Sequence, residues 1–279
     1  MADGRGRLVV VGTPIGNLGD LTPRAAEALR SADLVVAEDT RLAARLLARL
    51  EVRRPMLSFS EHNAAARVPE LLSRLAAGET LALTTDAGMP AVSDPGAAMV
   101  AAARGAGAVV EVVPGPSAVT AAMALAGVEA GGFVFGGFLP ARPAGARTAR
   151  LKALLDAAGG LGLPLVLFEA PHRIQGLLAA LASAVPAASV AVAREITKRH
   201  EETLVGSPAA VAERLGQPRG EFTVVVSAIS QAPRAGADAA ALLAAARQHD
   251  LAERATIDLL RAAGVPRREA YRLVHDKTD

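Results

Sequence analysis

The sequence predicts an α/β protein with two domains and a small helical module at its C-terminal end. Short β-branched runs alternate with Ala/Leu/Arg segments of helical period over the first 230 residues, and only helical periods follow. The length of 279 residues also corresponds to about two domains. We expect an N-terminal α/β domain at 1–115, a second α/β domain at 116–230, and a linker with a helical tail at 231–279.

The first domain is expected to contain a mostly parallel sheet. Thr22 and Pro23 provide an N-cap and a first helical residue, so a helix begins there and ends at Arg30. Apolar runs predict strands at 7–11, 33–37, 56–59, 80–84 and 108–113, and helical periods follow at 41–50, 66–77 and 96–105. These connections are long enough for crossovers between parallel strands.

The Pro-Gly-Pro turn at 114–116 interrupts this alternation, and Ser117 can cap a helix that ends at Ala126. A second series follows, with strands at 133–137, 164–169, 189–194 and 221–228, and helices at 147–157, 172–184 and 207–215. The stretch 139–145 is expected to be an exposed loop. It is either an ordinary solvated loop or one from which Arg142 and Arg147 reach a phosphate backbone.

Beyond residue 230 the pattern is helical throughout. A Pro/Gly linker at 231–236 precedes helical periods at 239–247, 251–263 and 267–274, the last two separated by Gly264-Val265-Pro266. This spacing is typical of a helix-turn-helix module. Nucleic-acid binding and a docking or oligomerising tail are both open interpretations of it.

The composition excludes several classes of protein. The absence of cysteine rules out a disulfide framework, a thiol nucleophile and a thiolate metal site, and the five His are too scattered to suggest a metal. Polar residues interrupt every apolar run, so no membrane span is expected, and without a signal-peptide core we expect a cytoplasmic protein. The net charge of +2 does not by itself indicate a nucleic-acid binder.

Three loops rich in small residues follow predicted strands, at 12–20, 84–96 and 113–118. The first is neither a P-loop nor a dinucleotide fingerprint, because its glycines have a different spacing. Asp86 and the backbone of residues 88–90 are the better ligand candidates in the second loop, whereas Asp94 and Pro95 suit the start of a helix. Loops at the carboxyl ends of strands in one parallel sheet should converge on a single cleft.

Nine motifs occur in order between residues 12 and 226: GTPIGNLGDLT, AEDTR, EHN, DAGMPAVSDPG, PGPSA, GFLP, FEAPHR, REITKRHEE and GEFTVVV. Together they resemble the small-subunit ribosomal RNA cytidine 2′-O-methyltransferase branch of the tetrapyrrole (corrin/porphyrin) methylase superfamily. Met89, Phe168 and Ala170 depart from the expected Thr, Tyr and Ser. These departures affect only polar roles at positions 168 and 170.

The resemblance implies a homodimer of two-domain α/β chains that holds S-adenosylmethionine between the domains. It also implies methylation of a cytidine ribose in the decoding region of 16S rRNA. By position, the cofactor contacts would be Pro14, Asp86, Gly88, Met89, Pro90, Ser93, Ser117, Ala118, Phe168, Glu169, Glu221 and Phe222.

A ribose hydroxyl needs a general base or stabilisation of the developing oxyanion. Three polar clusters, at 38–41, 61–63 and 194–198, supply the candidates His62, Asp39, Glu195 and Lys198. Each has a structural alternative: His62 as a hydrogen-bonded loop residue, Asp39 as a helix cap, and Glu195 with Lys198 as a salt bridge.

Arg173 is a candidate phosphate contact, with a solvated first-turn arginine as the alternative. Two other functions stay open. A methylase of a corrin or porphyrin precursor would need more aromatic surface than six Phe and one Tyr supply, and a non-catalytic RNA-binding assembly factor would not need three convergent loops.

Overall fold

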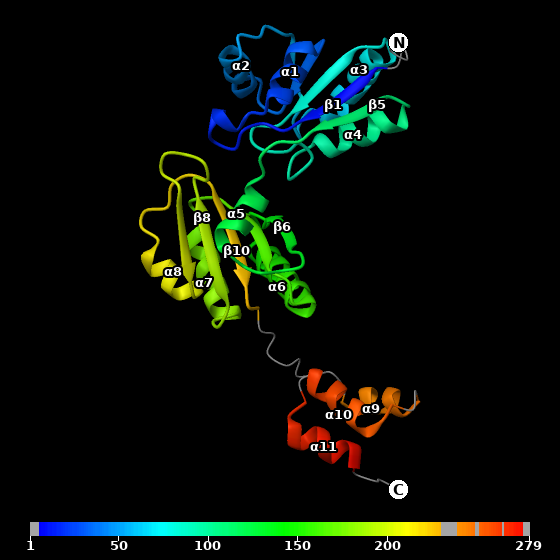
Figure 1. Ribbon diagram of the computed structural model, residues 1–279, viewed down its shortest axis with the longest axis vertical. Coiled ribbons are helices and arrows are strands. Elements are labelled where there is room, and N and C mark those ends of the chain that lie inside the picture. Colours follow the sequence, from blue (N-terminus) through cyan, green and yellow to red (C-terminus); the bar gives the residue numbers. More distant parts are fainter. Residues whose placement is uncertain (1–5, 230–238, 249–250, 264, 276–279) are drawn as a thin grey trace.

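The computed structural model describes residues 6–229, 239–248, 251–263 and 265–275 (Figure 1). Two α/β units and a cluster of helices account for these residues, as the fold class predicted from the sequence requires. In the described part of the chain, no helix combines the length and apolar character needed to cross a membrane.

The first sheet is entirely parallel, with the strand order β3-β2-β4-β1-β5. Leu8 and Val10 of β1 pack toward one pair of helices, and Val9 and Val11 pack toward the other pair. Both faces of the sheet are therefore covered, as buried parallel strands require. The strands are β1 (Arg7–Val11), β2 (Leu34–Ala37), β3 (Met56–Ser58), β4 (Thr80–Thr84) and β5 (Val109–Val113).

Helices α1 (Pro23–Ser31) and α2 (Thr40–Arg49) cover one face of this sheet, and α3 (Ala64–Ala76) and α4 (Gly96–Gly105) cover the other. A short 3-10 helix, Leu18–Asp20, precedes α1. Thr22 caps α1 by accepting a hydrogen bond from Ala25 N–H, with Pro23 in the first helical position as predicted. Because β4, β1 and β5 are neighbours, the loops that follow them leave from one edge of the sheet.

The second sheet is mixed, with the order β6-β7-β10-β8-β9. Only β6 and β7 are parallel, and the other neighbours are antiparallel. Its strands are β6 (Val134–Phe138), β7 (Leu165–Glu169), β8 (Ser189–Arg194), β9 (Glu202–Gly206) and β10 (Phe222–Ser227). Helix α5 (Ala118–Ala126) packs on one face, and α6 (Ala144–Leu161), α7 (Ile174–Ala184) and α8 (Pro208–Arg214) pack on the other.

The structure differs from the sequence prediction at three places in this unit. Strand β9 was not predicted, because this edge strand has only one fully buried residue, Leu204. Helix α6 begins at Ala144 and not at the predicted 147, so the end of the expected loop at 139–145 is helical. Ser117 occupies the N-cap position of α5 without a side-chain capping bond. In the first unit, α4 spans the predicted 96–105, with Pro95 at its N-cap.

Residues of the two units meet in one apolar cluster. Ile15, from the loop after β1, is buried with Val119 of α5 and Val166 of the second sheet. Because α5 packs on the second sheet, its position supports the proposed domain boundary near residue 115. The loop after β1 therefore contacts the second domain directly.

The helical module contains α9 (Ala239–Gln248), α10 (Glu253–Ala262) and α11 (Arg267–His275). Ile257 and Leu260 of α10 are buried against Ala270 of α11, so the module has a small core of its own. Its expected linker at 231–236 lies outside the described residues. The two interpretations of the module, nucleic-acid binding and docking, both stay predictions.

Candidate functional site

The loops after β1, β4 and β5 touch one another at the carboxyl edge of the first sheet. Thr13 and Gly88 exchange two main-chain hydrogen bonds, of 2.9 and 3.1 Å. Gly115 N–H contacts the Met89 sulfur at 3.3 Å. The predicted convergence of these three loops is therefore seen in the structure.

The loop between β4 and α4 is held in an uncommon backbone conformation. Ala91 and Ser93 have φ angles of 70° and 64°, values that residues with a side chain rarely adopt. Asp94 fixes this shape, because its Oδ1 accepts hydrogen bonds from Ala91 N–H at 2.9 Å and Gly96 N–H at 2.7 Å. Strain of this kind is concentrated at functional sites.

A cavity of about 410 Å³ lies between the two domains and is lined by both. Its volume is within the range typical of small-molecule sites. The first domain and α5 contribute Ile15, Glu38, Thr85, Asp86, Ala87, Gly88, Met89, Val92, Ser93, Asp94, Ser117, Ala118 and Val119. The second sheet and its loops contribute Phe138, Phe168, Glu169, Ala170, Pro171, Ile196, Glu221, Phe222 and Thr223.

Aromatic rings form part of the wall on the second domain. The Phe168 ring lies 5.1 Å from the Phe135 centroid, edge to face, and 5.4 Å from the Phe138 centroid. Phe138 is 54% exposed although it is apolar. An exposed ring at the mouth of a cavity is suited to packing against a flat ligand group.

Two carboxylates of the first domain give the cavity a negative wall. Burial raises the pKa of Glu38, and the nearby carboxylates of Asp86 and Asp94 raise it further, although Thr85 donates a hydrogen bond to Glu38 Oε2 at 2.9 Å. Burial also raises the pKa of Asp86, whose Oδ1 accepts Asp39 N–H at 3.0 Å. Neither side chain forms an ion pair with a described residue. The cavity is therefore suited to a cationic ligand group.

Glu169 is the most buried acid of the site, and two arginines balance its charge. Its side chain is fully buried, and it pairs with Arg147 of α6 and, at 2.9 Å, with Arg173 at the start of α7. Its Oε1 also accepts Ala170 N–H at 2.9 Å. Arg147 and Arg173, both predicted as phosphate contacts, are thus largely engaged in holding Glu169.

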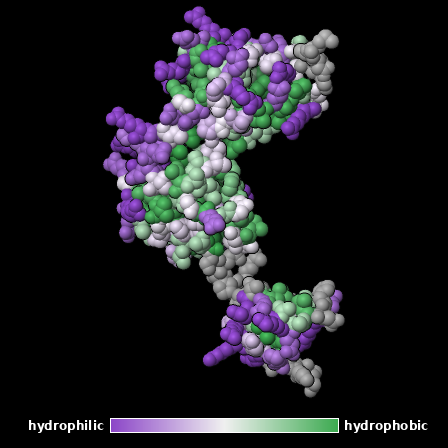
Figure 2. All heavy atoms as spheres, in the orientation of Figure 1, coloured by the Kyte–Doolittle hydropathy of each residue, from purple (hydrophilic) through white to green (hydrophobic). Residues whose placement is uncertain are grey.

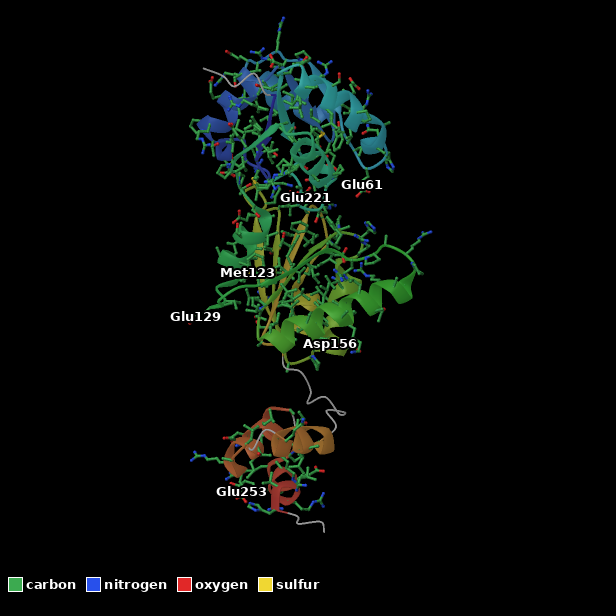
Figure 3. All side chains as sticks on the ribbon, turned by 90° about the vertical axis from the view of Figure 1, so that its right-hand side faces the viewer. Glu61, Met123, Glu129, Asp156, Glu221 and Glu253 are labelled. Atoms are coloured by element: carbon green, nitrogen blue, oxygen red, sulfur yellow. The ribbon has the colours of Figure 1, made fainter. Side chains whose placement is uncertain are left out.

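A second cavity, of about 280 Å³, adjoins the first. Ile15, Thr85, Asp86, Ala87 and Glu221 line both cavities. Figure 3 shows Glu221 at the level where the two domains face each other. The remaining wall of the second cavity comes from the loop after β1, from α2, from the end of β4 and from Lys198: Thr13, Pro14, Gly16, Leu18, Leu42, Ala43, Arg45, Leu46, Thr84 and Lys198.

Lys198 stands between two carboxylates in this second cavity. Its Nζ donates to Glu195 Oε1 and to Glu221 Oε2, each at 2.9 Å. Burial opposes its charge, but the two carboxylates outweigh burial and raise the pKa of Lys198. Lys198 is therefore a cation at neutral pH and is not suited to act as a base.

The loop that carries Lys198 also contacts the first domain. Glu195 and Thr197 adopt positive φ angles of 50° and 68°, so this segment is not helical. Thr197 Oγ1 accepts a hydrogen bond from Asn17 N–H at 3.1 Å. The Glu195–Lys198 salt bridge was predicted as the structural alternative, and it forms within this loop.

The residues predicted to contact a cofactor largely share one location. Pro14 lines the second cavity, and Pro90 is a buried residue that lines neither of the two. The others surround the main cavity: Asp86, Gly88, Met89, Ser93, Ser117, Ala118, Phe168, Glu169, Glu221 and Phe222. Their contact with a cofactor stays a prediction.

The predicted catalytic residues are more dispersed. Asp39 caps α2, and its hydrogen bonds with Arg41 lower the pKa of its carboxyl group to about 2. His62 lies on an exposed turn before α3, and neither His62 nor Asp39 is among the residues that line the two cavities. Only Lys198 of the four lines one of them. Arg142, predicted to contact RNA, is exposed ahead of α6.

Sequence reasoning missed Glu38, Phe138 and Thr223 as lining residues. A signal for Glu38 was present, because it directly follows β2, where parallel strands place ligand groups. Phe138 and Thr223 carried no such signal. Their position depends on the pairing of β6 and β10 with β7.

Comparisons with known proteins identify relatives along most of the chain. A family model described as "Tetrapyrrole (Corrin/Porphyrin) Methylases" matches residues 7–212. A protein of Xylella fastidiosa (strain Temecula1) is 45% identical over 226 residues, which cover 79% of this chain and 81% of that protein. A protein of Thermotoga maritima is 40% identical, over 80% of this chain and 98% of its own. Both are named "Ribosomal RNA small subunit methyltransferase I".

Solved structures share the fold at low sequence identity. A diphthine synthase superposes with a TM-score of 0.64 and 17% identity, over 79% of this chain and 90% of its own. A uroporphyrin-III C-methyltransferase from Thermus thermophilus, complexed with S-adenosylhomocysteine, has a TM-score of 0.57 and 21% identity, over 81% of this chain and 98% of its own. At such identities the likeness concerns the fold alone.

The electrostatics of Glu38 lead to a prediction for stability. Because folding raises the pKa of Glu38, the folded state retains this proton to a higher pH than the unfolded chain does. The carboxyl group therefore becomes destabilising as the pH rises through this range. We expect Glu38→Gln to melt at a higher temperature than wild type at pH 7, and the difference to vanish near pH 3, below the usual glutamate pKa of about 4.3.

Thermal denaturation followed by circular dichroism measures this difference. Glu61→Gln, which changes an exposed glutamate of the same domain (Figure 3), is the matched control and should show no such gain. A Glu38→Gln variant that is less stable than wild type at pH 7 would contradict the electrostatic interpretation.

Proposed function

The chain belongs to the tetrapyrrole (corrin/porphyrin) methylase family, and from this we propose that it transfers a methyl group from S-adenosylmethionine to the 2′-oxygen of a cytidine in the decoding region of 16S rRNA. The observation that carries the proposal is the relationship to proteins named as small-subunit rRNA methyltransferases, at 40–45% identity over about four fifths of the chain. The described structure provides a cavity and an adjoining cavity where two substrates can meet.

The residues of the main cavity fit S-adenosylmethionine. Glu38 and Asp86 offer negative charge without a paired cation among the described residues, and the ligand carries a sulfonium cation. Phe138 and Phe168 offer aromatic surface, and the loop from Asp86 to Ser93 offers main-chain polar groups close to the cavity. When bound, S-adenosylmethionine supplies an electrophilic methyl group for in-line displacement.

The second cavity is the proposed site of the acceptor nucleotide. It shares a wall with the main cavity, so an acceptor held there lies next to the cofactor. Orienting two reactants in this way can supply much of the rate enhancement of a displacement. Leu42 and Leu46 give this cavity apolar surface for a base, and Arg45 gives it a positive charge.

Two groups of the chain are placed to assist the acceptor oxygen. Lys198 has three N–H donors, of which two are used by Glu195 and Glu221, so the third is available to the acceptor oxygen as its charge develops. Asp86 and Glu221 are the described carboxylates that line both cavities. Since Glu221 is bound to Lys198 and burial raises the pKa of Asp86, Asp86 is the better proton acceptor.

The proposal extends to the setting of the reaction. We propose that the chain acts in the cytoplasm, as a homodimer, on 16S rRNA or the small ribosomal subunit. The names of the relatives support the rRNA substrate. The corrin or porphyrin precursor methylase is the alternative within the family, and solved neighbours of that kind are similar only at the level of fold.

Methyl transfer to small ribosomal subunits that lack the modification tests the function. We expect label from S-adenosylmethionine to enter 16S rRNA, and mass mapping to place it on the ribose of one cytidine. Label on a base, or transfer to a porphyrin precursor and not to the subunit, would reject the proposal.

Lys198→Met tests the proposed stabilisation of the acceptor oxygen. Loss of the Lys198 ammonium group as a donor should lower kcat by about 10²-fold, while the affinity for S-adenosylmethionine stays that of wild type. Lys198→Arg, which keeps a cation, should recover part of the rate. Lys152→Met, at an exposed position on α6, is the control, and a wild-type kcat for Lys198→Met would exclude the role.

A further inference from the structure

Helix α2 carries a row of exposed arginines on its outer face. Arg41, Arg45 and Arg49 recur every four residues, so they lie on one side of the helix at intervals of about 6 Å. The opposite side packs into the core through Leu47, which is 3% exposed. Hydrophilic residues gather over this end of the first domain in the space-filling view (Figure 2). We call these three residues the α2 arginine row.

The α2 arginine row has little counter-charge. The helix contains no acidic residue, and the side chains of Arg45 and Arg49 form no ion pair or hydrogen bond with any residue that the structure describes. Arg41 pairs with Asp39 and lies in the first turn, where the helix dipole disfavours a cation. Like charges four residues apart also destabilise a helix slightly. The fold therefore gains nothing from this arrangement, apart from a favourable dipole interaction at Arg49 in the last turn.

Three other arginines of the first domain each have an acidic partner. Arg7 pairs with Glu111 at 2.5 Å, Arg67 with Glu70 at 2.8 Å and Arg74 with Glu79 at 3.1 Å. Helix α3 therefore pairs both of its arginines with acids, whereas α2 has three arginines and one acidic partner, Asp39, among the described residues. Arg104 of α4 is also exposed without an ion pair, but it is the single arginine of its helix. A row of three arginines with one acidic partner is suited to a negative partner from outside the chain.

The α2 arginine row leads into the cavity assigned to the acceptor. Arg45 lines that cavity together with Leu42 and Leu46 of the same helix, and Lys198 lines it from the second domain. An acceptor nucleotide in the cavity therefore brings its own phosphates close to Arg45, and the next phosphates toward Arg49. The arginine guanidinium matches phosphate oxygens in geometry, and leucine side chains offer apolar contact to a base.

We infer that the α2 arginine row binds the phosphate backbone of the RNA strand that carries the acceptor nucleotide. The inference rests on the proposed function and adds the surface by which the substrate is held. It also gives Arg147 and Arg173 a different role from the predicted phosphate contact, because both hold the buried Glu169. The RNA then approaches along the first domain, on the side of α1 and α2 (Figure 1).

The test compares the double variant Arg45→Gln/Arg49→Gln with wild type, both as full chains. Glutamine keeps helix propensity and removes the charge. Arg104→Gln is the matched control, because Arg104 is exposed on α4, which covers the opposite face of the sheet. Binding to unmodified small ribosomal subunits is measured by co-sedimentation at several salt concentrations, methyl transfer is measured in parallel, and thermal melts check folding.

The double variant should bind with a weaker salt dependence. Each lost phosphate contact lowers the slope of log K against log salt by about 0.7 for a single strand, so the slope should fall by about 1.4. If the double variant and wild type bind equally well near 1 M salt, this change in slope corresponds to about 25-fold weaker binding of the double variant at 0.1 M salt. Arg104→Gln should match wild type in both slope and affinity.

The outcomes separate this inference from the proposed function. A double variant with the affinity and slope of wild type would overturn the inference, even if methyl transfer is observed. If the double variant binds more weakly than wild type, but wild type transfers no methyl group to the subunit, the inference is supported and the proposed function is rejected. If wild type does not bind the subunit at all, both fail.

Discussion

The close approach of Gly12 and Gly115 is the contact on which the proposed site depends. A Cβ atom on Gly12 would lie 2.5 Å from the Gly115 nitrogen, so the two loops can touch only without side chains at these positions. This contact brings the β5 loop against the β1 loop, and Met89 of the β4 loop packs on the same point. Three separate connections therefore become one wall of the cavity between the domains.

The charged residues near this cavity are of two kinds. Some have an oppositely charged partner within the chain, and others have none among the described residues. Glu169 is buried with two arginines and an N–H donor, so its negative charge is compensated within the chain. Glu38 and Asp86 form no ion pair with a described residue, and burial raises the pKa of both, although the charge of Arg41 acts on Asp86 in the opposite direction. On α2 the excess charge is positive, because Arg45 and Arg49 have no acidic partner among the described residues. Charged groups without an ion pair are the ones for which a ligand of opposite charge is proposed.

Much of the fold could be predicted from the sequence because its signals are local. Buried parallel strands appear as short apolar runs, and the helix start at Thr22-Pro23 has its own capping signature. The glycine-rich loops could also be placed at strand ends without knowledge of the strand order. Strand β9 could not be predicted, because an edge strand is held by its neighbour β8 more than by its own residues.

The candidate site was predictable where it depends on loops and less so where it depends on distant side chains. Asp86, Ser93 and Ser117 line the cavity because their loops follow neighbouring strands. The engagement of Arg147 and Arg173 by Glu169 arises only when the starts of α6 and α7 meet the end of β7. Histidine is a residue type suited to general base catalysis, yet the exposed turn of His62 lies outside the lining of both cavities.

Amide hydrogen exchange with and without S-adenosylhomocysteine tests whether the cavity between the domains holds the cofactor. We expect slower exchange with the ligand in the segments 84–94, 117–119, 168–171 and 221–223, which contribute lining residues to this cavity. Saturating binding that leaves these four segments unchanged and protects another part of the chain would contradict this expectation.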